Sequence, residues 1–383
     1  MFTIITFILV LSVLVFAHEL GHFLTARRFG VKAEEFGFGF PPRAAGYYKD
    51  KSGKWKFVFH NKEVEDASDT VYSINWLPLG GFVKIKGENG DSNDPDSFAM
   101  KKIWQRTAIL SAGVTMNVVL AAALLSLGLM IGMPMALDEI NPSAQISDRK
   151  IQITSVLPDT PAAKSNIKAG DVIEDINGVV FKNYEDLQTF VDGNTGKELT
   201  YHIKRADQKL TVNITPEYIK EAEKGGIGVG IAETGIVKYP ILIALWEGTK
   251  GAFFLTWGIL LAFYELFKNL LMGHGPGGDL AGPVGIATMT GQAARMGFAY
   301  VLQFAAMLSI NLAIINFLPF PALDGGRVLF LIIEKIKGSP VKREVEAVIH
   351  NIGFALLMVL VLVVTFRDVS KFSAIKSLID KIF

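Results

Sequence analysis

Long apolar stretches with few charged residues dominate the pattern along this 383-residue chain. Because a helix needs about 20 apolar residues to cross the hydrocarbon core of a bilayer, four of these stretches predict transmembrane helices. We place them at residues 1–26, 105–137, 296–323 and 347–366. The pattern therefore predicts a polytopic α-helical membrane protein with four transmembrane helices.

The first stretch has an alternative interpretation as a signal peptide that is removed after export. A signal peptide has a basic segment before its apolar core and small residues at a cleavage site. Neither feature is present, and the stretch carries His18 and Glu19 near its end. We therefore interpret it as a retained transmembrane helix.

A fifth apolar segment, residues 251–264, is uncharged but only 14 residues long. This length favours a helix that lies in the membrane interface over one that crosses the membrane. We expect it within a linker at residues 218–295.

Basic residues beside the predicted spans orient the chain, because cytoplasmic flanks carry an excess of Lys and Arg. Such residues follow the first and third stretches and precede the second and fourth: Arg27, Arg28, Lys32, Lys101, Lys102, Arg106, Arg327, Lys335, Lys337, Lys342 and Arg343. We therefore expect residues 27–104 in the cytoplasm. Both termini, including the tail at residues 367–383, and the segment between the second and third spans are expected outside.

Within that outer segment, residues 140–217 show the pattern of a small α+β domain. Alternating and turn-bounded segments predict strands at residues 151–156 and 170–178, and a β-hairpin at residues 199–204 and 209–214. Helices are expected after residue 160 and at residues 184–191.

Composition agrees with a membrane protein and excludes several function classes. Hydrophobic residues make up 50% of the chain and charged residues only 20%. The 38 basic and 37 acidic residues leave a net charge of +1, which gives no reason to expect nucleic acid as a partner. Cysteine is absent, so a disulfide framework and thiol catalysis are excluded.

Candidate chemistry begins at the cytoplasmic end of the first span, in the sequence His18-Glu19-Leu20-Gly21-His22. Residues i and i+4 share a helix face, so His18 and His22 can direct two imidazoles at one zinc ion. Glu19 lies beside that face and can take a proton from a zinc-bound water. The alternative is a pair of interfacial histidines beside a snorkelling glutamate. We favour the metal site, because ionisable residues inside a membrane segment are costly and usually functional.

A catalytic zinc needs a third protein ligand and an open position for water. Asp324 is the sole carboxylate in a long apolar stretch, and it lies at the cytoplasmic end of the third span, like the two histidines. It could instead cap a helix that begins at Gly325, but beside His18 and His22 we favour the ligand. If residues 251–264 crossed the membrane, Asp324 would emerge on the opposite side from the histidines, so the segment is expected not to cross.

The His18–His22 motif, the sequence from Asn316 to Gly326 and the α+β insert between them resemble the site-2 protease family. These are intramembrane zinc metalloproteases, and the closest type is the bacterial regulator of sigma-E protease. Further matching stretches lie at residues 37–40, 77–82, 111–117 and 282–286.

The resemblance covers nearly the whole chain and implies specific roles. His18, His22 and Asp324 would be the zinc ligands and Glu19 the catalytic residue, in a protein of the bacterial inner membrane. Residues 140–217 look like a PDZ domain, and the chain has one where the best-studied bacterial members have two. Such a domain could bind an extended peptide end by adding a strand, or it could only exclude bulky substrates, and both alternatives stay open.

The cytoplasmic loop also contains apolar residues that are unexpected outside a membrane: Trp76, Leu77, Leu79, Phe82 and Val83. We expect a re-entrant, membrane-associated β-hairpin beside the active site, an element that the family has. It could hold the substrate as an added strand, with Asn316, Gly80 and Gly81 as candidate substrate-binding residues. An ordinary small β-fold on the membrane surface is the alternative.

The sequence therefore predicts an intramembrane zinc metalloprotease, with Zn²⁺ as cofactor, that cleaves single-pass proteins within or near their transmembrane segment. By the resemblance, substrates are anti-sigma factors already shortened by another protease, or remnant signal peptides; membrane lipid is a further partner. One rival is a non-enzymatic PDZ-containing adaptor with a vestigial zinc site, against which the intact motif residues argue. A second rival, a zinc carrier, would need more polar residues along the spans.

Overall fold

The computed structural model describes residues 2–88, 94–138, 140–205, 208–219, 223–273 and 281–370. The chain divides into two units, the first formed by residues 1–127 and 245–383 and the second by residues 128–244. Most of the tail predicted at residues 367–383 lies outside the described residues.

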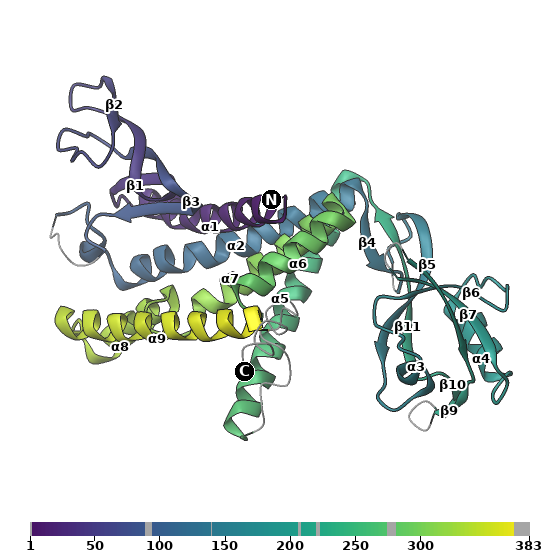
Figure 1. Cartoon of the computed structure of the whole chain (residues 1–383). Helices are drawn as coiled ribbons and strands as arrows, with labels where there is room; N and C mark the ends of the chain where they lie inside the picture. Colours follow the sequence, from purple (N-terminus) through teal and green to yellow (C-terminus); the bar gives the residue numbers. More distant parts are fainter. Residues whose placement is uncertain are drawn as a thin grey trace, which may run out of the picture. The chain divides into compact units, whose positions relative to one another are not determined.

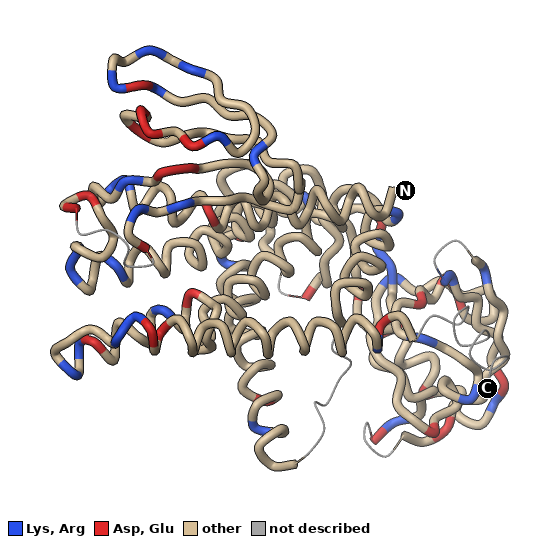
Figure 2. The backbone as a smooth tube through the Cα atoms, turned by 60° about the vertical axis from the view of Figure 1, so that its left-hand side comes forward, with Lys and Arg blue, Asp and Glu red and all other residues tan. Residues whose placement is uncertain are grey.

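The first unit consists of long apolar helices and one small sheet (Figure 1). Among the described residues, five helices are long and apolar enough to cross a membrane: α1 (Phe2–Arg28), α2 (Ile103–Ile131), α5 (Ile241–Leu271), α7 (Phe298–Phe317) and α9 (Arg343–Ser370). Two shorter helices, α6 (Pro283–Met296) and α8 (Asp324–Lys337), precede and follow α7, and a 3₁₀ turn, Phe98–Met100, precedes α2. Figure 2 shows few charges along α1, α2 and α7, whereas charged residues gather on the strands and on α8.

Helix α5 corrects the length predicted for the fifth apolar segment. It has 31 residues, because it continues through Glu247 and Lys250 before the apolar core and through Glu265 and Lys268 after it. Lys and Glu are good helix formers, so a change in hydropathy does not end a helix. In Figure 1, α5 runs across the direction of α1 and α2.

Close packing of glycines joins α1 to its neighbours. A Cβ on Gly21 would lie 2.3 Å from the carbonyl oxygen of Ala112, so α1 and α2 approach backbone to backbone. At the start of α1, a Cβ on Gly291 of α6 would lie 2.4 Å from Thr3. Further along, Val10 and Leu14 of α1 pack with Ala305 of α7. Helix α7 therefore lies beside α1.

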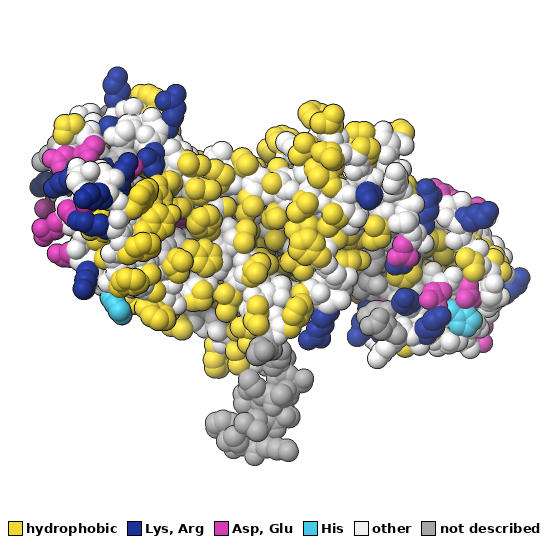
Figure 3. Space-filling view, turned by 90° about the horizontal axis from the view of Figure 1, so that it is seen from above, with side chains coloured by type: hydrophobic (Ala, Val, Ile, Leu, Met, Phe, Trp, Pro, Cys, Tyr) yellow, Lys and Arg dark blue, Asp and Glu magenta, His cyan; other side chains and the backbone are white. Residues whose placement is uncertain are grey.

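Three strands form a sheet against α1: β1 (Ala33–Lys49), β2 (Trp55–Phe59) and β3 (Val71–Ile85), in the order β2-β1-β3. The hydroxyl of Ser12 on α1 donates a hydrogen bond to the carbonyl oxygen of Pro78 on β3 at 2.8 Å. Trp76 is 64% exposed and Ile74 63%. Figure 3 shows that hydrophobic side chains cover much of the first unit in this view. A β-structure with exposed apolar side chains is thus present where the sequence predicted a membrane-associated hairpin.

The second unit is an α+β fold with a six-stranded antiparallel sheet, whose strand order is β4-β11-β5-β6-β7-β8, and a two-stranded sheet of β10 and β9. Its elements are β4 (Met133–Ala136), β5 (Gln145–Val156), α3 (Pro161–Lys164), β6 (Val172–Ile176), α4 (Tyr184–Asp192), β7 (Leu199–Arg205), β8 (Gln208–Ile214), β9 (Glu217–Ile219), β10 (Lys224–Gly226) and β11 (Val229–Lys238). The core includes the buried residues Ile153, Ile176, Leu187, Tyr201 and Ile203.

The strands and helices predicted within residues 140–217 are all present, but the sheet extends beyond those bounds. Strand β11 lies between β4 and β5, so residues 229–238 belong to this sheet and not to the linker predicted at residues 218–295. The pairing of β11 with strands far back in the chain is non-local, and a local hydropathy pattern cannot reveal it.

Candidate functional site

Helices α1 and α2 together enclose two imidazoles. His18 and His22 are one turn apart on α1 and are both 6% exposed. Gly113 of α2 faces them: a Cβ there would lie 2.4 Å from Nε2 of His22 and 2.8 Å from Nε2 of His18. Only a glycine leaves space for both rings at this place, so α2 shapes a cradle around the two Nε2 atoms.

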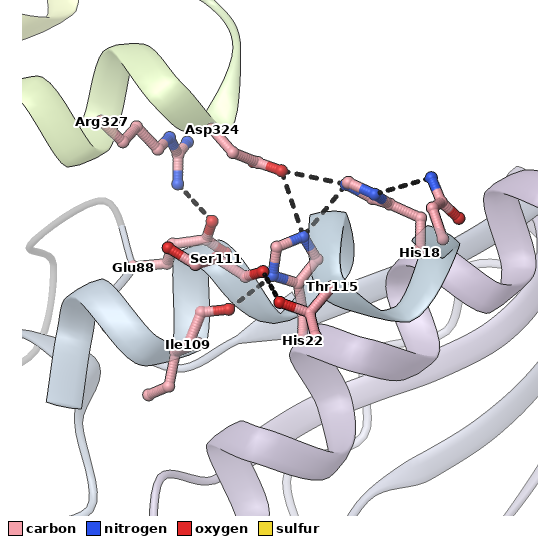
Figure 4. A network of polar contacts seen from close by, with 9 residues as sticks. His18, His22, Glu88, Ile109, Ser111, Thr115, Asp324 and Arg327 are labelled. Carbon is pink, nitrogen blue, oxygen red and sulfur yellow. Dashed lines mark hydrogen bonds and ion pairs between the residues drawn. The ribbon is translucent and has the colours of Figure 1, made fainter. Parts of the chain in front are cut away.

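Asp324 completes the cluster from α8. Its Oδ2 lies 3.0 Å from Nε2 of His18 and 3.3 Å from Nε2 of His22, and the two Nε2 atoms are 3.1 Å apart. Figure 4 shows the carboxylate directed at both rings. Asp324 is the first residue of α8 and its side chain turns to the histidines, whereas the N-cap residue is Leu323. In the structure, Asp324 therefore does not serve only as a helix cap.

The turn between α7 and α8 carries Asp324 to this position. A Cβ on Gly325 would lie 2.2 Å from the carbonyl oxygen of Phe317, so the first turn of α8 folds back onto the end of α7. Helix α9 supports the same turn, because Nδ1 of His350 accepts a hydrogen bond from the backbone N–H of Ala322 at 2.8 Å. A backbone contact with α7 and a side chain of α9 thus fix the turn that carries the carboxylate.

The three donor atoms fit a zinc ion. Zinc bonds to His nitrogen and carboxylate oxygen are about 2.0–2.2 Å long, and a tetrahedral ion therefore separates its ligand atoms by about 3.3–3.6 Å. The three separations of 3.0, 3.1 and 3.3 Å are close to that edge length. His18, His22 and Asp324 also match in number the three protein ligands of a catalytic zinc site, which keeps a fourth position open.

Sequence reasoning missed the groups behind the imidazoles. Nδ1 of His22 lies 2.8 Å from the carbonyl oxygen of Ile109, and Nδ1 of His18 lies 3.4 Å from Nδ2 of Asn117. Both partners are on α2. Only the family resemblance indicated a role for residues 111–117, and no local sequence pattern distinguishes Asn117 from an ordinary buried polar residue.

Glu19 and the predicted substrate-binding glycines lie together. Gly81 on β3 leaves space for α1: a Cβ there would lie 2.8 Å from Cα of Phe16 and 3.2 Å from Cγ of Glu19. Gly80 has a φ of +101°, which other residues adopt only with strain, and a Cβ on it would lie 2.5 Å from Val15. The bend of β3 at these glycines therefore lies directly over the turn of α1 that carries Glu19.

Two further residues define the surroundings. Asn316 is half-buried in the last turn of α7, and no hydrogen bond or ion pair found among the described residues joins its side chain to the cluster. Glu88 and Arg327 form an ion pair on the α8 side of the site, which the sequence did not suggest (Figure 4). Asp324 and Arg327 lie one turn apart on α8, so this pair ties the start of α8 to the loop after β3.

Comparisons with known proteins give matches over nearly the whole chain. The model of peptidase family M50 matches residues 6–360. The regulator of sigma-W protease RasP of Bacillus subtilis is 31% identical, over 96% of this chain and 98% of its own length. The zinc metalloprotease RasP of Bacillus licheniformis is also 31% identical, over 96% of this chain and 99% of its own length. The PDZ domain of an SdrC-like protein of Listeria monocytogenes matches 23% of this chain and 92% of that structure at 25% identity, with a TM-score of 0.21.

Proposed function

On the premise that this chain belongs to peptidase family M50 and is a zinc metalloprotease, we propose that it hydrolyses peptide bonds within or near the transmembrane segment of single-pass membrane proteins. The observation that carries the proposal is the cluster of His18, His22 and Asp324 among helices that are long and apolar enough to cross a membrane. A water-soluble peptidase has no need of a site in such surroundings.

The side chains of the site divide the chemical work. We assign His18, His22 and Asp324 to zinc, which when bound polarises the scissile carbonyl and acidifies water. Glu19, next to His18 on α1, accepts the proton of the attacking water and delivers it to the leaving amine. Contacts from α2 hold the two imidazoles, and the packed turn between α7 and α8 holds the carboxylate, so all three need little rearrangement during the reaction.

A helical substrate hides its carbonyl groups in hydrogen bonds, so the segment to be cleaved must first become extended. Strand β3 offers a template for this change, because its bend at Gly80 and Gly81 lies over Glu19. The exposed apolar side chains of Trp76 and Leu77 on the same strand suit the hydrocarbon region. We propose that substrate adds as a strand to this hairpin. We propose Asn316, at the end of α7, as a further contact of the substrate strand.

The packing of α7 supports a topology in which α5 makes no crossing. Helix α7 begins after α6, whose Gly291 contacts Thr3 at the start of α1, and it is followed by Asp324 beside His18. Helices α1 and α7 therefore run in the same direction and begin on the same side of the membrane. Because α2 has already returned the chain to that side, α5 cannot add a single crossing, although it is long enough.

We therefore propose four transmembrane helices, α1, α2, α7 and α9, with both termini and the α+β unit outside. On this topology α5 lies in the outer interface, with Trp246 and Trp257 near the headgroups. The α+β unit would act as a PDZ-like domain that either recruits substrates or excludes bulky ones. By the family resemblance, the substrates are membrane-anchored anti-sigma factors already shortened by another protease, or remnant signal peptides, in a bacterial inner membrane.

Cleavage of a model single-pass substrate by the purified full-length chain in detergent tests the function. We expect cleavage that a zinc chelator abolishes and added zinc restores. Glu19→Gln keeps the shape of the side chain but cannot accept the proton, so it should retain zinc and lose about 10²–10⁴-fold in rate. Glu63→Gln, a change of an exposed carboxylate in the loop after β2, is the matched control and should cleave normally.

The rival adaptor makes the opposite prediction. A protein that only binds membrane proteins would retain the substrate without cleaving it, with or without zinc. Near-normal cleavage by Glu19→Gln, or cleavage that persists after complete zinc removal, would contradict the proposed mechanism.

A further inference from the structure

Asn117 is a buried polar side chain whose position in the middle of a membrane helix calls for an explanation. It is 0% exposed on α2, and its Oδ1 has no hydrogen-bond partner. Its Nδ2 lies 3.4 Å from Nδ1 of His18. The hydroxyl of Ser309 on α7 donates to the backbone oxygen of Asn117 at 2.8 Å, so α7 packs against this turn of α2. Buried polar atoms without partners are rare and usually have a function.

The chemistry of a histidine ligand explains the unpaired oxygen. His18 presents Nε2 to the cluster, so zinc bound there leaves the ring proton on Nδ1, and Nδ1–H then needs an acceptor. The amide as it stands offers Nδ1 a donor, which suits only the tautomer whose proton is on Nε2. A half-turn about the Cβ–Cγ bond exchanges the oxygen and nitrogen of the amide with little change in shape. That half-turn brings Oδ1 to the position where it accepts from Nδ1–H.

We propose that Asn117 is a positioning residue whose amide follows the tautomer of His18. It donates to Nδ1 when the proton is on Nε2, and it accepts from Nδ1–H when zinc occupies Nε2. His22 needs no such device, because the carbonyl oxygen of Ile109, 2.8 Å from its Nδ1, is a permanent acceptor. Helix α2 thus orients both imidazoles from behind. The inference rests on the zinc ligands assigned under the proposed function.

An asparagine that served only to pack α2 against α1 would behave differently on substitution. Leucine has nearly the same shape and no polar atoms, so it would satisfy a packing role. Aspartate would place a charge in a buried position, which is costly without a partner. For a positioning residue the order of the two variants reverses. A carboxylate can only accept a hydrogen bond and therefore favours the zinc-bound tautomer of His18, whereas leucine offers no acceptor to Nδ1–H.

The test is the zinc affinity of the full-length chain in detergent, measured by competition with a chelator of known affinity. We expect Asn117→Leu to weaken zinc binding by about 10–100-fold, as the loss of such an outer partner does. Asn117→Asp should bind zinc at least as tightly as the parent. The matched control is Ser309→Ala, which removes a contact to the same turn but not to the ring, and its zinc affinity should not change. Normal affinity in Asn117→Leu together with weakened affinity in Asn117→Asp would overturn the proposal.

A measurement on the unaltered protein covers the case in which a variant does not fold. With ¹⁵N-labelled histidine and zinc bound, His18 should carry a proton on Nδ1 that exchanges slowly with water, as should His22, the internal reference. A His18 proton that exchanges as fast as that of an exposed histidine would refute the role of Asn117. The proposed function fails separately: if His18→Ala keeps full zinc affinity, the ligand assignment is wrong, whatever Asn117 does.

Discussion

Replacing Gly113 by alanine tests whether the space in front of the two imidazoles is a metal site. The added methyl group would lie 2.4 Å from Nε2 of His22 and 2.7 Å from Cε1 of His18. Non-bonded heavy atoms settle at about 3.5–4.0 Å, so the rings would have to withdraw by about 1 Å. Zinc sites tolerate deviations of only about 0.2 Å in ligand distance.

We therefore expect Gly113→Ala to lose more zinc affinity than the roughly 10–100-fold that an outer-partner mutation costs. The overpacking should also destabilise the fold by about 1–3 kcal/mol. The assay is chelator competition on the full-length chain in detergent, with a thermal unfolding curve for each variant. Gly258→Ala on α5 is the matched control, because nothing lies within 4 Å of the Cβ it would add. Zinc binding by a folded Gly113→Ala variant with the affinity of the parent would refute the site geometry.

Three further outcomes are expected. Gly81→Val should lower kcat/KM by about 10-fold or more while zinc content stays normal, because the side chain would enter the space over Glu19; unchanged cleavage would exclude β3 from substrate binding. Burial acts to raise the pKa of Asp171, but hydrogen bonds and charge from the Arg205 guanidinium hold that pKa below its ordinary value of 3.8. The ionised carboxylate therefore stabilises the folded α+β unit at neutral pH, and this contribution is lost as the pH falls below about 3.8. The stability difference between the parent and Asp171→Asn, followed by hydrogen exchange of residues 145–205, should therefore shrink in acid, and a constant difference would contradict the assignment. Single cysteines at positions 249 and 269, near the two ends of the apolar core of α5, should both react with an impermeant maleimide added to intact cells; labelling at 269 only after permeabilisation would show that α5 crosses.

Local patterns in the sequence determined much of the site. A spacing of four residues places His18 and His22 on one face of any helix, whatever the rest of the chain does. The apolar stretches determined where long helices form, since their backbone hydrogen bonds and their hydropathy are both local properties. Asp324 could also be predicted from the sequence, because a lone carboxylate in an apolar stretch is costly without a partner.

Contacts between distant segments were decided only by the tertiary structure. The partners of the two imidazoles lie 87 and 99 residues away from them in the chain, so no periodicity connects them. The need for glycine at position 113 is also a tertiary effect, because it arises from the two histidine rings of α1 that pack against that face of α2. Strand β11 joins the sheet beside β4 and β5, and its hydrophobic pattern alone does not specify those neighbours. Sequence thus determined which side chains could perform the chemistry, whereas packing between helices decided how they are held.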